Sequence, residues 1–198
     1  MKYLGLILFL IPYTASAQFS KGTVVVGGSM SYSSQTQNIT DGDYPASSYL
    51  SLSPTIGVFV SPTVSVNVLG QVYSQKNPTI NVITNLFETE KSVSQIYGLL
   101  VRKYFPLSDK FLLSLNGKAG AGSRIKNEDS DTKTSQLIIS ISPALTFIPH
   151  KNWGIEGGFG QISYEKNSQQ NPYYDSDQFK ASLGELGLGV NYYFNRKN

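Results

Sequence analysis

The stretch YLSLSPTIGVFVSPTVSVNVLGQVY, from Tyr49 to Tyr73, alternates apolar and polar side chains on both sides of a short turn. Before the turn, leucine, isoleucine and valine occupy most alternate positions, with serine, threonine and glycine between them. After it, valine alternates with serine, asparagine and glutamine. Because successive side chains of a strand point to opposite faces, the pattern predicts two strands, each with one apolar face. The turn Ser61-Pro62-Thr63 joins them as an antiparallel hairpin.

The same alternation recurs along the rest of the chain. The further stretches are Thr23 to Ser33, Val93 to Phe105, Lys110 to Gly122, Gln136 to Ile148, Trp153 to Tyr164 and Phe179 to Phe194. Short turns, at Ser61–Thr63, Pro106–Asp109 and Pro149–Asn152, alternate with long polar loops at about 34–48, 74–92, 123–135 and 165–178. This regular sorting of loop lengths is typical of membrane barrels. We therefore predict an all-β fold, an eight-stranded antiparallel up-and-down transmembrane β-barrel.

Alternation alone leaves open which face is inside, since a soluble ligand-binding barrel would turn its apolar face inward. The polar face here consists mostly of small residues that suit a narrow lumen. We therefore expect Leu137, Ile139 and Ile141 to face lipid, and Ser140 and Lys118 to lie inside. Aromatic residues near the strand ends predict interfacial girdles; they are Tyr32, Tyr49, Tyr73, Tyr104, Phe105, Phe147, Trp153, Tyr164, Tyr192, Tyr193 and Phe194.

Three details of the strands call for local irregularity or extension. Pro54 and Pro143 lie inside predicted strands and lack an N–H, so we expect a bulge or a local break in the ladder at each. The segment Ile80 to Phe87 is unusually apolar for a loop. It either extends the barrel as a hairpin above the membrane or forms a contact surface.

The N-terminus has the pattern of a secretory signal peptide. Lys2 supplies a positive charge, Leu4 to Ile11 form a short apolar run, and Ala15-Ser16-Ala17 is a small-residue cleavage site. We therefore assign residues 1–17 to a signal peptide and residues 18–198 to the barrel. The expected location is the outer membrane of a Gram-negative-type bacterium.

Composition narrows the possible functions. The formal net charge is +3 and charged residues make up only 15% of the chain, with no basic cluster, so a nucleic-acid partner is not expected. The chain contains no cysteine, which excludes disulfides, thiolate metal sites and a cysteine nucleophile.

The few charges on the polar face have both signs. Counting along the strands places Arg102 and Glu156 each near a short turn, and Lys118 and Glu185 at mid-strand. Because a lone buried charge is costly, we predict two levels of structural ion pairs in the lumen, Arg102 with Glu156 and Lys118 with Glu185.

Candidate catalytic chemistry is sparse. His150, the only histidine, could act as a base, but it lies in a short turn with no nucleophile or orienting carboxylate nearby, so a polar turn residue is the preferred interpretation. Glu156 and Glu185 could form an acid–base pair, although counter-ions are the simpler assignment. The acidic run Glu128 to Asp131 lacks the spacing of a calcium loop. We predict no catalytic, cofactor-binding or metal-binding residues.

Several phrases, taken in order, resemble small outer-membrane barrel proteins of the OmpA/OmpW-like type. They are Ser53-Pro54-Thr55-Ile56-Gly57, Val101-Arg102-Lys103-Tyr104-Phe105-Pro106, Ser142-Pro143-Ala144-Leu145, Asn152-Trp153-Gly154-Ile155-Glu156-Gly157 and Leu188-Gly189-Val190-Asn191-Tyr192-Tyr193-Phe194. The resemblance implies an eight-stranded barrel, mostly without assigned chemistry. Such barrels usually end at the terminal aromatic residue, whereas here Asn195-Arg196-Lys197-Asn198 follow Phe194.

Four functions remain, in order of preference. The first is a non-enzymatic outer-membrane barrel with a structural or surface-binding role. The others are an OmpW-like narrow channel for small hydrophobic molecules, a secreted soluble ligand-binding barrel, and a lipid-modifying barrel enzyme. For the first we expect a monomer without cofactor, in contact with membrane lipid and lipopolysaccharide and inserted by the outer-membrane assembly machinery.

Overall fold

The computed structural model describes residues 19–36, 38–39, 42–43, 46–80, 87–126, 133–170 and 173–194. The predicted signal peptide, the acidic run 128–131 and the terminal residues 195–198 lie outside these ranges. So do the side chains of residues 185 and 186. The described part of the chain contains no helix long and apolar enough to cross a membrane.

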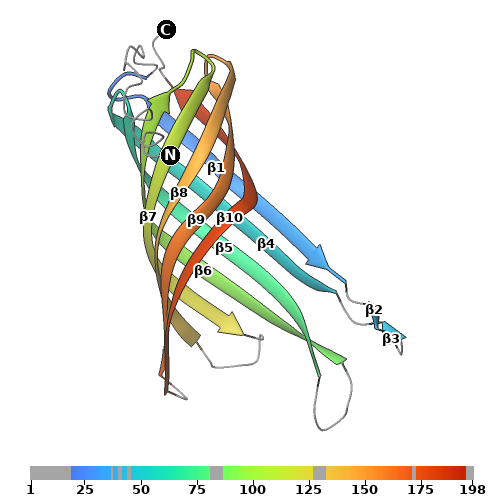
Figure 1. Ribbon diagram of the computed structural model, residues 1–198. Helices are drawn as coiled ribbons and strands as arrows, with labels where there is room; N and C mark the ends of the chain where they lie inside the picture. The colour runs from blue at the N-terminus through green and yellow to red at the C-terminus, as the bar shows by residue number, and fades with distance from the viewer. Residues whose placement is uncertain are drawn as a thin grey trace, which may run out of the picture.

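The chain folds as a ring of eight long antiparallel strands (Figure 1). The ring runs β1-β10-β9-β8-β7-β6-β5-β4, so consecutive strands of the ring are neighbours, and its first and last strands, β1 and β10, pair with each other. The strands are β1 (Val24–Gln35), β4 (Ser47–Ser61), β5 (Val64–Ile80), β6 (Phe87–Pro106), β7 (Phe111–Lys126), β8 (Lys133–His150), β9 (Trp153–Gln170) and β10 (Tyr173–Phe194). A separate two-residue pair, β2 (Asn38–Ile39) and β3 (Gly42–Asp43), lies between β1 and β4 in the chain. The predicted barrel is confirmed.

The two ends of the barrel differ. The short connections β4–β5, β6–β7 and β8–β9 lie at the same end of the barrel as the start of β1 and the end of β10, here called the turn end. At the opposite hairpin end, much of what the sequence predicts as loop is strand. For example, β5 and β6 stay paired as far as Ile80 and Phe87, whereas residues 81–86 of the apolar segment between them lie outside the described residues. Serine, glutamine and asparagine can continue a hydrogen-bonded strand where both of its faces contact water. Polar composition alone therefore does not end a strand.

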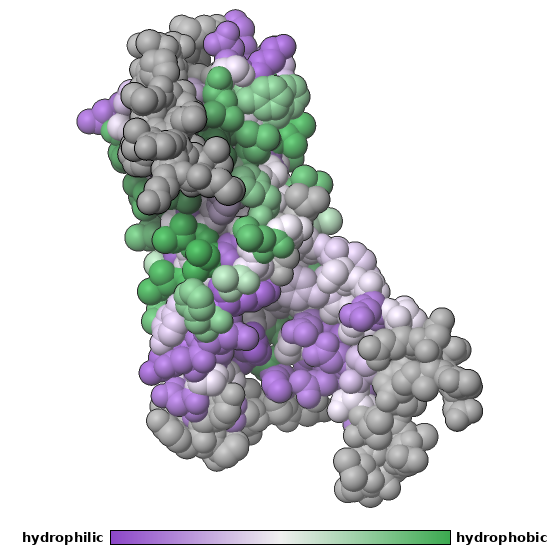
Figure 2. Space-filling view, viewed as in Figure 1, coloured by the Kyte–Doolittle hydropathy of each residue, from purple (hydrophilic) through white to green (hydrophobic). Residues whose placement is uncertain are grey.

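The apolar face of the barrel points outward. Ile141 is 53% exposed, and Leu137 and Ile139 are exposed to a similar degree. Ser140, between them, is only 5% exposed. Figure 2 shows apolar surface on the visible face of the barrel wall and hydrophilic surface beyond it toward the hairpin end. A soluble ligand-binding barrel needs the opposite arrangement. The wall is therefore suited to contact with acyl chains, and the fold is that of a transmembrane barrel.

The strand prolines interrupt the ladder as expected, each in a different way. At Pro54 the pairing of β4 with β5 skips two residues between Leu52 and Thr55 but keeps its register. At Pro143 the register between β8 and β9 shifts between Ile141 and Ala144. In both cases the pairing with the other neighbouring strand continues.

The predicted aromatic girdle is only partly correct. Tyr32 and Trp153, among others, are exposed on the outer face. However, Tyr104 and Tyr193 are fully buried inside the barrel, and Tyr49 and Tyr73 line a cavity at the hairpin end. Position near a strand end does not decide the face; parity along the strand does, and these four tyrosines share parity with the lumen residues.

Candidate functional site

The lumen is closed at the turn end by an apolar cluster, here called the plug. Its members are Phe19, Val25, Phe59, Tyr104, Leu112, Ile148 and Tyr193. The ring of Phe19 lies 4.2 Å from that of Phe59 and 4.7 Å from that of Tyr193, measured between centroids. The backbone N–H of Gly22 donates to the carbonyl of Phe59 at 2.8 Å, which holds the segment before β1 across the mouth. Neither Phe19 nor this closure was expected from the sequence.

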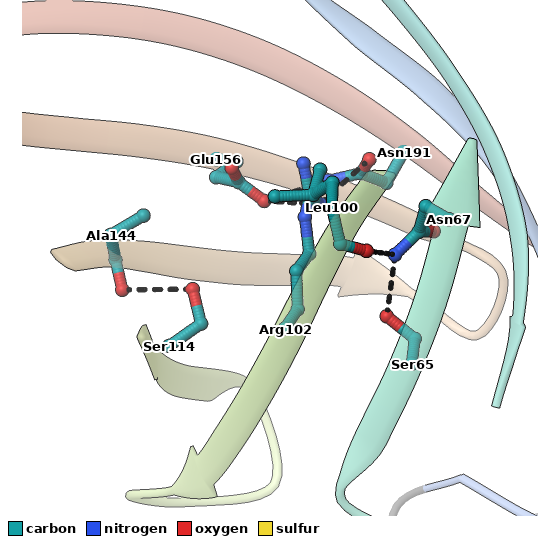
Figure 3. Close-up of polar contacts among 8 residues, drawn as sticks. All are labelled: Ser65, Asn67, Leu100, Arg102, Ser114, Ala144, Glu156 and Asn191. Atoms are coloured by element: carbon teal, nitrogen blue, oxygen red, sulfur yellow. Dashed lines mark hydrogen bonds and ion pairs between the residues drawn. The ribbon is translucent and has the colours of Figure 1, made fainter. Parts of the chain in front are cut away.

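A polar layer lies directly above the plug. Arg102 is two residues from Tyr104 on β6, and Asn191 is two residues from Tyr193 on β10, so both point into the lumen one step toward the hairpin end. Arg102 Nη1 donates to Glu156 Oε2 at 2.8 Å and to Asn191 Oδ1 at 3.3 Å (Figure 3). Asn191 Nδ2 also donates to Glu156 Oε2, at 3.1 Å. The structure thus brings together the first expected ion pair.

The charged side chains of this layer are largely buried, and they are hydrogen-bonded to each other and to Asn191. The side chains of Arg102 and Glu156 are only 8% and 13% exposed. Beside them, Asn67 Nδ2 donates to the hydroxyl of Ser65 and to the carbonyl of Leu100, both at 3.0 Å. Buried charges that are paired and hydrogen-bonded in this way hold strands at fixed distances and leave no wide aqueous path.

Of the second expected ion pair, Lys118 with Glu185, the structure describes only the Lys118 side chain. Lys118 points into the lumen, and its ammonium donates to Gln71 Oε1 at 3.1 Å. The side chain of Glu185 is outside the described part, so the expected contact between these two residues stays a prediction. The irregularity between Leu183 and Leu186, where β10 gains two residues relative to β9, lies at that position.

A polar cavity of about 350 Å³ occupies the hairpin half of the lumen. Its lining includes Tyr49 and Tyr73, whose ring centroids are 5.8 Å apart. Arg124 donates through Nε to Ser94 at 3.0 Å, and its Nη2 lies 3.6 Å from Glu165 Oε1. Gln136 donates to the same carboxylate oxygen at 2.9 Å.

Arg124 and Glu165 were not singled out in the sequence, although both lie in the lumen. Arg124 lies an even number of residues from Lys118 on β7, so strand alternation could have placed its side chain in the lumen. Glu165 fell within a predicted loop, so no parity was assigned to it.

The remaining candidates from the sequence are His150, Glu156 and the acidic side chains. His150 is exposed at the end of β8, at the turn end of the barrel, whereas the cavity lies in the hairpin half. Glu156 is paired with Arg102 instead of with a second carboxylate. Among the described residues, no group of three or more histidine, aspartate or glutamate side chains is placed to hold a metal ion.

Comparison with known proteins gives a likeness in fold. No family model matches the chain, and no curated protein matches it by sequence. Among solved structures, Neisserial surface protein A (NspA) superposes with a TM-score of 0.52 at 11% identity, covering 86% of this chain and 96% of that one. The outer membrane protein OprG from Pseudomonas aeruginosa superposes with a TM-score of 0.53 at 10% identity, covering 89% and 97%. The chain has the fold of the small outer-membrane barrels that its sequence phrases resemble.

Proposed function

We propose that this chain is an integral outer-membrane protein of a Gram-negative-type bacterium, with a structural or surface-binding role and no catalytic activity. Residues 1–17 serve as a cleaved export signal, and the outer-membrane assembly machinery inserts the remaining chain as a monomer among lipid and lipopolysaccharide. The observation that supports this best is the closed lumen. The plug and the Arg102–Glu156 layer block the turn end, while long strands project at the hairpin end.

The projecting strands supply the surface on which binding would occur. Beyond the apolar band, β5 and β6 continue to Ile80 and Phe87, and β9 and β10 to Gln170 and Tyr173. Paired strands hold side chains in fixed positions better than loops do, and a rigid contact surface loses less entropy on binding.

The test is location together with physical state. In cell fractionation the protein should appear in the outer-membrane fraction, beginning at Gln18 by N-terminal sequencing. Folded, unboiled protein should migrate differently from boiled protein and need detergent to stay monomeric. A water-soluble monomer, or a protein retained in the inner membrane, would contradict the proposal.

A second candidate is the narrow channel for small hydrophobic molecules. One observation favours it: β1 pairs with β10 only from Val24 and Phe194 to Met30 and Leu188, so the wall is not fully paired between these two strands. The lining of the hairpin-half cavity opposes it, because glutamine, serine and charged side chains predominate there over apolar ones. A hydrophobic solute would gain little on entering such a space.

A further inference from the structure

The cavity in the hairpin half of the lumen is closed on the side of the turn end. Its volume of about 350 Å³ falls within the range of roughly 300 to 1,000 Å³ that is typical of small-molecule sites. On its turn-end side, Lys118 Nζ donates to Gln71 Oε1 at 3.1 Å, and the polar layer and the plug follow. A solute that enters from the hairpin end therefore stops in this cavity instead of crossing the barrel.

The polar space continues from the cavity to the rim of the barrel. A second hollow of about 160 Å³ adjoins the cavity, and the two share Tyr49 and Gln75. The lining of this hollow also includes Gln35, where β1 ends, and Ser47, where β4 begins. We call the cavity and the hollow together the outer pocket.

Four polar side chains of the cavity have no hydrogen-bond partner among the described residues. They are Gln161 and Ser163 on β9, Gln178 on β10 and Ser92 on β6. Each amide offers both donors and acceptors, and each hydroxyl group can donate one hydrogen bond and accept others. These side chains therefore suit a ligand that itself carries donors and acceptors side by side, as hydroxyl groups do.

The charged side chains of the cavity do not select a charged ligand. Arg124 Nη2 lies 3.6 Å from Glu165 Oε1, and the same oxygen accepts a hydrogen bond from Gln136 at 2.9 Å. Lys180, the third charged residue of the lining, is not free either. A charged ligand would have to compete for partners that these side chains already contact, whereas a neutral ligand leaves those contacts in place.

Two tyrosine rings give the polar wall an apolar patch. Tyr49 on β4 and Tyr73 on β5 both line the cavity, and their ring centroids are 5.8 Å apart. The face of an aromatic ring carries partial negative charge, so it attracts C–H groups with partial positive charge. A sugar ring has such C–H groups on its face and hydroxyl groups around its edge. Stacking on tyrosine also removes apolar surface from water, which adds affinity to the hydrogen bonds that a sugar exchanges with water.

We propose that the outer pocket binds a neutral saccharide. The sugar ring lies against Tyr49 and Tyr73, and its hydroxyl groups form hydrogen bonds with Gln161, Ser163 and Gln178. Both a free sugar and the end of a longer glycan carry this chemistry. The inference rests on the proposed surface-binding role and names the chemical class of the ligand.

Three other classes of ligand fit the outer pocket less well. A hydrophobic molecule would cover the tyrosine rings but leave the amide and hydroxyl groups without partners. An open-chain polyol would satisfy those groups but has no ring face to lie against tyrosine. An anion would have to displace Glu165 from Arg124.

The test measures saccharide binding to the mature full-length protein by saturation-transfer NMR. The detergent is a polyoxyethylene ether, because its head group is not a sugar. The probes are glucose, galactose, N-acetylglucosamine and lactose, with sorbitol as the open-chain polyol and glucuronate as the anion. We expect at least one of the four neutral sugars to bind with a Kd of about 1 mM or below. Sorbitol should bind about tenfold more weakly than that sugar, and glucuronate no more tightly than glucose.

Tyrosine variants locate the site. Tyr49→Ala/Tyr73→Ala should weaken binding about tenfold, whereas Tyr32→Ala/Tyr97→Ala should leave it unchanged. Tyr32 and Tyr97 are 64% and 65% exposed on the outer face, and both double variants lose two tyrosine side chains. Each variant is first shown to be folded by the mobility difference between unboiled and boiled samples.

A glutamine variant tests the polar wall separately. Gln161→Leu removes one amide from the cavity and should weaken binding about fivefold, as the loss of one hydrogen bond predicts. Gln95→Leu is the matched control, because Gln95 is exposed and lies outside the cavity lining. Its affinity for the sugar should equal that of the unmodified protein.

Several results would overturn the proposal. These are a Kd weaker than about 10 mM for all four neutral sugars, sorbitol binding as tightly as the best sugar, or equal losses in the two tyrosine variants. Tighter binding of glucuronate than of glucose would assign the outer pocket to an anion instead. Failure of the proposed membrane location would be distinct, because the protein would then lack the mobility difference and the need for detergent.

Discussion

At the scale of single residues, Glu156 is the acceptor on which the polar layer depends. Its Oε2 atom accepts from both Arg102 and Asn191. Glu156→Gln leaves the Arg102 guanidinium buried without a counter-ion. We expect the free energy of unfolding in lipid vesicles, measured with urea, to fall by about 3 kcal/mol. Asp109→Asn, at an exposed turn position, is the control and should change it little. A loss in Glu156→Gln no larger than in the control would show that the pair contributes no stability.

Phe19 gives a second prediction at this scale. It is 3% exposed and its ring contacts two other plug rings. Phe19→Ala should lower the unfolding free energy by about 3 kcal/mol, the usual cost of removing a buried aromatic ring. Phe179→Ala is the matched control, because Phe179 is 72% exposed on the outer face and lipid fills the space that its ring leaves. Equal losses in the two variants would contradict the assignment of Phe19 to a packed plug.

At the scale of strands, β6 and β7 approach closely on the lumen side because glycine occupies the contact. A Cβ on Gly98 would lie 2.1 Å from the carbonyl oxygen of Ala119 and 2.5 Å from Cα of Gly120, both backbone atoms that move only with the strand. Gly98→Ala should therefore destabilise the barrel by about 2 kcal/mol in the same urea assay. A Cβ on Gly187 meets nothing within 4 Å, so Gly187→Ala is the control. Equal stability of the two variants would mean that the strands can separate at low cost.

The short pairing of β10 with β1 predicts an uneven pattern of hydrogen exchange along β10. Amides from Leu188 to Phe194 lie between two neighbouring strands, whereas those from Tyr173 to Leu183 have only β9 beside them. Backbone amides on the free edge should exchange their hydrogens rapidly with solvent, and those in the paired part should be protected from exchange. Amide exchange followed by mass spectrometry or NMR in detergent checks this. Uniform protection along β10 would mean that β10 is paired on both sides over its whole length in solution.

The strands and their outward faces could be predicted from the sequence because strand parity is a local property. Leu137, Ile139 and Ile141 show this, since their exposure follows directly from alternation. Parity could also have placed Tyr104 and Tyr193 in the lumen, but position near the strand ends pointed to a girdle instead. The short pairing between β1 and β10 could not be predicted, because it depends on how far the first and last strands pair with each other. Phe19 precedes the first strand, so no periodicity marked its place in the plug.

At the scale of the whole molecule, the plug and the polar layer predict an insulating barrel. Mature protein reconstituted in planar lipid bilayers should insert without steady single-channel conductance, because an apolar cluster and a buried ion pair leave no continuous aqueous path. Phe19→Ala/Phe59→Ala enlarges the mouth and should increase the frequency of brief openings, and Phe179→Ala should not. Stable conductance of the unmodified protein would contradict the closed lumen and favour the channel.

The short junction between β1 and β10 also bears on how the barrel assembles. Every other junction joins strands that follow one another around the ring in chain order and can form as a local hairpin, whereas this one unites the two ends of the polypeptide. It has seven register pairs, against twelve between β1 and β4. Closing the ring thus has the greatest entropic cost of loop closure, and it is compensated by the fewest residue pairs between strands. Ring closure should accordingly be the last and slowest event of insertion, and this junction should be the first to separate when the protein is pulled from the bilayer.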